Sequence, residues 1–142
     1  MPTQSGMRES WADVVTSDEA PAAIGPYSAG IRVRAGCGLV FVSGQLPLDP
    51  QSGETIQGDA GAQVTRALRN GLAVVEAAGS RIGDIVRVTV YVSDMTQFAL
   101  INDAYAKFFG DWHPARAVVE VSRLPRDCSL EVDMIAVVPT DR

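Results

Sequence analysis

The chain of 142 residues is poor in the side chains that most metal sites and nucleophilic sites require. It has one histidine, His113, and two cysteines, Cys37 and Cys128, that stand far apart in the sequence. Such isolated residues match neither the ligand spacing of a zinc site nor the cysteine framework of a small secreted protein. We therefore predict no metal site and two free, structural thiols.

Sequence motifs of covalent and cofactor-dependent enzymes are missing too. No segment matches G-x-S-x-G, the loop that carries an activated serine in many hydrolases. No segment matches G-x-G-x-x-G or G-x-x-x-x-G-K either, the loops that bind nucleotide phosphates. His113 stands directly before Pro114 and is interpreted as a loop residue near the start of a strand, not as a base. We therefore expect no nucleotide cofactor.

Positive charge and aromatic residues are scarce. The 12 lysines and arginines are outnumbered by 17 acidic residues, and only 6% of the residues are aromatic. Neither the electrostatic attraction nor the stacking surface of a nucleic-acid-binding protein is evident. Signal-peptide and membrane-spanning runs are not evident either. We expect small-molecule or protein partners, no nucleic acid, no membrane and a cytoplasmic location.

The sequence does contain enough hydrophobic residues, 46%, for the core of one domain. We interpret residues 1–20 as a loosely ordered N-terminal arm and residues 21–142 as a single domain. Periodicity and turn residues predict strands at 31–34 and 39–43, a helix at about 59–78, a strand through "DIVRVTVYVSD", a helix ending at Gly110, and strands at 117–122 and 130–138.

Local signals also predict how these elements connect. The glycines of "AGCG" favour a hairpin between the first two strands, and "RLPRDCS" favours a hairpin between the last two. Asp59 and Asp94 are predicted helix caps. Alternation predicts that four valines share one face of the middle strand, namely Val86, Val88, Val90 and Val92.

The two predicted helices can cover only one face of a sheet of five or six strands. However, "LVFV" and "MIAVV" are apolar on both alternating faces, as strands covered on both sides are. Because the chain offers no further helix, we expect copies of the same chain to cover the second face. This predicts a closed homo-oligomer with clefts between subunits.

A charged residue, Arg116, opens the apolar segment "HPARAVVEVSRLP". Because a guanidinium keeps its charge, this position requires an anion, a carboxylate or carbonyl groups nearby. Other polar residues on the apolar frame are Tyr27, Ser43, Gly44, Gln45, Asn102 and Glu131. Each also has an ordinary interpretation, such as a packing tyrosine, a solvent-facing asparagine, an edge carboxylate at Glu131 or an interface ion pair of Arg116.

Five segments suggest a family: "AIGPYS" (23–28), "VFVSGQLPLDPQSG" (40–53), "ALRNGLAVVEAAG" (67–79), "FALINDAYAKFF" (98–109), and "PARAVVEVSRLPRD" (114–127) followed by "EVD". In this order they resemble the RidA family, also called YjgF/YER057c/UK114, from about residue 20 to 138. The resemblance implies a chorismate-mutase-like α+β subunit, a mixed sheet with two helices packed on one face. It also implies that this subunit forms a homotrimer with clefts at its interfaces. It also implies hydrolysis of reactive enamines and imines, such as 2-aminoacrylate, to 2-oxo acids and ammonia without metal or cofactor.

The resemblance assigns roles to the polar residues. Arg116 would hold the substrate carboxylate and Glu131 would lie near the attacking water, so these two are the candidate catalytic residues. Candidate substrate-binding residues are Tyr27, Ser43, Gly44, Gln45, Asn102 and Val118. The chain departs from the family pattern at Val118, where many members have cysteine, and at Ala29 and Gly30, where Gln-Ala is usual. These departures bear on the substrate range.

Two other functions remain open from the sequence. One is a non-catalytic module that binds small carboxylate metabolites through Arg116, and the other is an RNA-directed activity, which the acidic composition disfavours.

The predicted hairpin at "RLPRDCS" would set Arg116 and Glu131 about five residues, or roughly 17 Å, apart along one ladder. We therefore expect a competent cleft to take Arg116 from one subunit and Glu131 from its neighbour.

Overall fold

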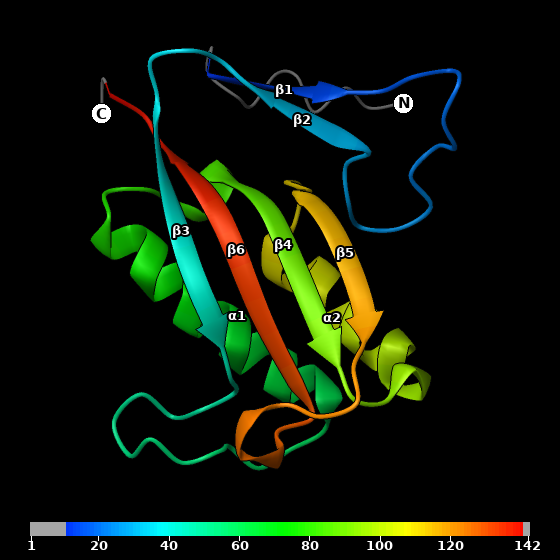
Figure 1. Ribbon diagram of the computed structural model, residues 1–142, viewed down its shortest axis with the longest axis vertical. Helices are drawn as coiled ribbons and strands as arrows, with labels where there is room; N and C mark the ends of the chain where they lie inside the picture. The colour runs from blue at the N-terminus through cyan, green and yellow to red at the C-terminus, as the bar shows by residue number, and fades with distance from the viewer. Residues whose placement is uncertain (1–10, 141–142) are drawn as a thin grey trace.

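The computed structural model describes residues 11–140 and contains two sheets and two long helices (Figure 1). The strands are β1 (Ala12–Val15), β2 (Gly30–Val33), β3 (Gly38–Gln45), β4 (Ile85–Val92), β5 (Ala115–Glu120) and β6 (Leu130–Val138). The helices are α1 (Ala60–Ala77) and α2 (Phe98–Phe109), with short 3-10 turns η2 (Ile82–Asp84), η3 (Met95–Gln97) and η4 (Pro125–Asp127).

The main sheet is mixed, with strand order β3-β6-β4-β5. Strand β6 pairs antiparallel with β3 and β4, whereas β4 and β5 run parallel because α2 carries the chain back between them. Both helices lie behind the same face of this sheet (Figure 1). The predicted α+β arrangement, a mixed sheet with two helices on one face, is confirmed.

The helix layer forms as its sequence signals predict. Helix α1 begins after Asp59, whose side chain accepts a hydrogen bond from the Ala62 backbone N–H at 2.9 Å. Its core face is fully buried at Val64, Leu68 and Val75. Helix α2 ends at Gly110, where φ is 62°, a value that glycine adopts at little cost.

Both predicted hairpins are wrong. Strand β2 pairs with β1 rather than with β3, and β4 lies between β5 and β6. Gly36, at φ 91°, does turn the chain after β2, but the turn leads into a different sheet. Turn residues show that a chain reverses or bends, and they do not show which strand becomes the neighbour.

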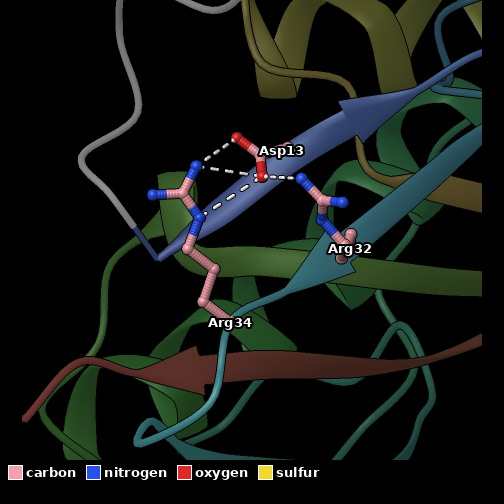
Figure 2. A network of polar contacts seen from close by, with 3 residues as sticks. All are labelled: Asp13, Arg32 and Arg34. Atoms are coloured by element: carbon pink, nitrogen blue, oxygen red, sulfur yellow. Dashed lines mark hydrogen bonds and ion pairs between the residues drawn. The ribbon is translucent and has the colours of Figure 1, made fainter.

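Strand β1 lies within the range predicted to be a loosely ordered arm. Its Asp13 carboxylate receives hydrogen bonds from Arg32 at 2.9 Å and from Arg34 at 2.8 Å, both from the β2 side of the pair (Figure 2). Trp11 and Ala12 are buried against Val86 and Val137 of the main sheet. The arm prediction for residues 1–10 lies outside the described residues.

The alternation of β4 is interrupted near its start. Ile85 pairs with Ala136 and Arg87 with Ile135, so β4 has one extra residue there, a β-bulge. Val88, Val90 and Val92 face the helices as predicted, but Val86 instead packs in the cluster under β1. The prediction of four valines on one face is therefore wrong at Val86.

The sheet face opposite the helices is only partly covered. The β1–β2 pair covers one end of it, where Trp11 and Val137 are buried. Beyond that end, Phe41 is 70% exposed and Leu39 is 50% exposed on β3, and Val119 is 39% exposed on β5. An apolar surface of this kind marks an interaction site in many proteins.

Candidate functional site around Arg116

Arg116 projects from the edge strand β5 toward helix α2. It pairs in register with Val88, whose side chain faces the helices, and its Nη1 donates a hydrogen bond to Asn102 Oδ1 at 2.8 Å. The guanidinium carbon lies 4.7 Å from the ring centre of Tyr105, 5.4 Å from Tyr27 and 5.9 Å from Phe98. Arg116 thus occupies a half-buried site bounded by aromatic rings and one amide.

No carboxylate in residues 11–140 forms an ion pair with Arg116, whereas the exposed Arg32, Arg34 and Arg123 each pair with an aspartate. Partial burial lowers the pKa of Arg116 from its ordinary value, since removal from water disfavours the charged form. A guanidinium has five N–H donors in a planar fork, and Asn102 accepts only one of them. The arrangement suits an anion with two oxygens, such as a carboxylate.

The loop that carries Tyr27 is fixed beside Arg116. The Ser28 backbone N–H donates to Pro114 O at 3.1 Å, which ties the loop to the start of β5. A side chain at Gly25 would begin 3.6 Å from Arg116 Nη2, so the backbone passes close to the guanidinium. The Tyr27 hydroxyl accepts a hydrogen bond from the Ile24 N–H at 3.3 Å.

A second group of predicted residues gathers at the end of β3. The β3–β6 register passes directly from Val42 to Gln45, so Ser43 and Gly44 form an irregularity without Cα partners in the ladder. The Gln45 side-chain amide donates to Ser43 O at 3.1 Å. A Cβ on Gly44 would lie 2.8 Å from Glu131 Cδ, so this close approach requires glycine.

Glu131 is half-buried on β6, a central strand, so its interpretation as an edge carboxylate is wrong. It alternates with Leu130 and Val132, which are fully buried under the helices, and it therefore faces the opposite side of the sheet. Its cross-strand partner Tyr91 donates a hydrogen bond to Asp133 Oδ2 at 2.9 Å. This contact raises the pKa of the Tyr91 hydroxyl.

Within one chain, Arg116 and Glu131 do not meet. Arg116 is aligned through Val88 with Met134, which is three residues from Glu131 along β6. The two residues are thus separated by two strand spacings, about 9.5 Å, and by about 10 Å along the strands. They also lie on opposite faces of the sheet. The predicted pairing of the last two strands is wrong. The observed strand order nevertheless also places Arg116 and Glu131 at separate locations within one chain.

The structure adds to the Arg116 group two aromatic residues, Phe98 and Tyr105, to which the sequence analysis assigned no role. Phe98 and Tyr105 lie four residues before and three residues after Asn102 on α2, so all three share one helix face. That spacing was a usable signal. Val118 follows Arg116 on the same face of β5 and packs against the core, so its side chain is close to the group.

Among residues 11–140, no cluster of three or more histidine, cysteine, aspartate or glutamate side chains is placed to hold a metal ion. Both cysteines are free. Neither helix in the described part of the chain is long and apolar enough to cross a bilayer.

Comparison with known proteins shows close relatives along nearly the whole chain. The family model described as endoribonuclease L-PSP matches residues 17–138. A 2-iminobutanoate/2-iminopropanoate deaminase from Escherichia coli is 44% identical over 126 residues, which cover 87% of this chain and 95% of the relative. A RutC family protein from Pyrococcus abyssi is 44% identical over 124 residues, covering 87% and 95%.

Solved structures agree with these sequence relatives. The crystal structure of Escherichia coli TdcF with bound serine has a TM-score of 0.67 and 44% identity, covering 88% of this chain and 98% of the other. The YjgF gene product of the same organism has a TM-score of 0.68 at 44% identity, with the same coverage. The chain belongs to the RidA (YjgF/YER057c/UK114) family, as its sequence motifs predicted.

Proposed function

We propose that this protein hydrolyses small imino acids to 2-oxo acids and ammonia. The observation that carries the proposal is Arg116, a half-buried guanidinium with one amide partner and no carboxylate partner among residues 11–140. An imino acid supplies the missing carboxylate, and the two parallel N–H donors of the fork fix the position of its C=N carbon. Relatives that are 44% identical carry the name of this activity.

The chemistry requires little beyond positioning. Water adds to the C=N carbon, the nitrogen takes up a proton, and the resulting amino alcohol loses ammonia to leave the 2-oxo acid. A carboxylate that accepts a proton from the attacking water assists the first step, and Glu131 is the candidate. Backbone N–H groups around Ser43 and Gly44 are candidate donors to developing negative charge.

Because Glu131 and Arg116 lie on opposite sheet faces in one chain, we place the complete site between two subunits. The exposed apolar residues Leu39, Phe41 and Val119 lie on the same sheet face as Glu131 and support burial of that face against another copy. In a homotrimer, the Arg116 side of each subunit contacts the Glu131 side of the next subunit. This arrangement gives three equivalent sites.

A non-catalytic role in binding carboxylate metabolites is the competing proposal. The TdcF structure contains serine, a small molecule with a carboxylate, so binding alone is a specific alternative. It predicts that a 2-oxo acid protects the protein from thermal unfolding while imino acids decay at their uncatalysed rate.

The test generates 2-aminoacrylate and larger imino acids in situ with a lyase or an amino-acid oxidase and follows their decay. We expect the parent protein to accelerate decay, and both Arg116→Ala and Arg116→Lys to lose most of that acceleration, since lysine has no planar fork. The matched control is Arg123→Ala, which removes an exposed arginine paired with Asp127. Parent-like decay with Arg116→Ala would contradict the carboxylate role.

A further inference from the structure

Tyr105 lies directly behind the Arg116 guanidinium. Its ring centre is 4.7 Å from the guanidinium carbon, nearer than the ring of Tyr27 or Phe98. Tyr105 is fully buried, whereas Phe98 is 38% exposed and Tyr27 is partly exposed. The Tyr105 ring is therefore the inner wall of the site, and the other two rings lie toward solvent.

The hydroxyl of Tyr105 has no hydrogen-bond partner among the described residues. A buried hydroxyl without a partner costs stability, so hydrogen bonding does not explain this side chain. Burial also raises the pKa of Tyr105 above its ordinary value, which keeps the phenol neutral. What Tyr105 offers to Arg116 is therefore the face of an uncharged aromatic ring.

An aromatic face attracts a guanidinium, and the attraction grows when water is excluded. On the inner side water is excluded, since Tyr105 packs with Phe109 at a ring-centre distance of 4.7 Å, and Phe109 is only 5% exposed. Asn102, one turn earlier on the same helix, fixes Nη1 from the side. Together they determine the plane of the guanidinium and leave its remaining donors available to a ligand.

We infer that Tyr105 is a positioning residue for carboxylate binding: its ring holds the Arg116 fork in the orientation that accepts a carboxylate with two oxygens. This inference rests on the proposed role of Arg116. It predicts that loss of the ring weakens carboxylate binding, while loss of the hydroxyl alone does not.

The experiment compares Tyr105→Leu, Tyr105→Phe and Phe109→Leu in the full-length protein. Titration calorimetry with 2-oxobutanoate measures carboxylate binding without turnover, and imine decay gives KM and kcat. We expect Tyr105→Leu to raise the dissociation constant and KM by about fivefold or more, with a smaller change in kcat. Tyr105→Phe keeps the ring, so it should bind like the parent and unfold at the same or a higher temperature.

Phe109→Leu controls for lost packing, because Phe109 touches the Tyr105 ring but does not stack on Arg116. It should lower the unfolding temperature and leave the dissociation constant unchanged. The inference is overturned if folded Tyr105→Leu binds within twofold of the parent, or if Phe109→Leu weakens binding equally. If the parent protein binds 2-oxobutanoate but does not hydrolyse imino acids, the proposed function is contradicted. The effect of Tyr105→Leu on the dissociation constant then still decides whether Tyr105 positions Arg116.

Discussion

At the scale of single residues, the proposed site depends on Arg116 and Glu131, two side chains that do not meet within one chain. Arg116 has three aromatic rings and one amide around it, and Glu131 rests against the backbone of Gly44. The sequence and its family resemblance predicted Arg116, Asn102 and Tyr27, and the structure brings these three together. Phe98 and Tyr105 were missed because an aromatic residue at helical spacing is usually core.

Gly44 offers a residue-scale test of the Glu131 position. A Cβ on Gly44 would lie 2.8 Å from Glu131 Cδ, so Gly44→Ala must displace the carboxyl group. We expect kcat for imine hydrolysis to fall by about tenfold or more, because a misplaced base loses much of its effect. The unfolding temperature should change little, since the glutamate side chain can move.

The matched control is Gly38→Ala on the same strand. There the added Cβ would meet Val138 Cβ at 3.5 Å, an ordinary contact. Equal kcat values for Gly44→Ala and the parent would show that the Glu131 position is unimportant.

At the scale of elements, α1, α2, β4 and β6 were predictable and the strand neighbours were not. Hydrophobic periodicity and caps such as Asp59 are local signals, and the structure confirms them at the predicted places. Pairing is decided by contacts between distant segments, as when β4 lies between β5 and β6. Strand β1 was missed because four residues in a polar segment give little alternation to detect.

The β1–β2 pair provides an element-scale prediction of pH dependence. Hydrogen bonds from Arg32 and Arg34 lower the pKa of Asp13 below its ordinary value of 3.8. A carboxyl group with a lowered folded-state pKa stabilises the fold above its unfolded pKa, and this contribution is lost as the pH falls through the folded pKa.

We therefore expect Asp13→Asn to lower the unfolding temperature at pH 7, with the difference from the parent vanishing as the pH falls below the lowered pKa of Asp13. Asp18→Asn, at an exposed aspartate in the following loop, should show no such difference. Calorimetry across this pH range measures both. A difference that persists unchanged in strong acid would show that the Asp13 charge is not the cause.

At the scale of the whole molecule, the two faces of the main sheet have separate roles. One face carries the helices and, at its edge, Arg116, while the other carries Glu131 and exposed apolar residues of β3 and β5. The sequence predicted an uncovered face from strands that are apolar on both sides. It could not show that the β1–β2 pair covers one end of that face, since this depends on tertiary contacts of Trp11 and Val86.

The most direct test of a site shared between subunits is complementation of two inactive variants. Arg116→Ala and Glu131→Ala proteins are unfolded, mixed in equal amounts and refolded, and native mass spectrometry establishes that mixed oligomers form. In a closed ring assembled at random, about one quarter of the interfaces combine an intact Arg116 with an intact Glu131. We predict recovery of up to that fraction of the parent imine-hydrolysis rate, whereas no recovery in demonstrably mixed oligomers would contradict a site built from two subunits.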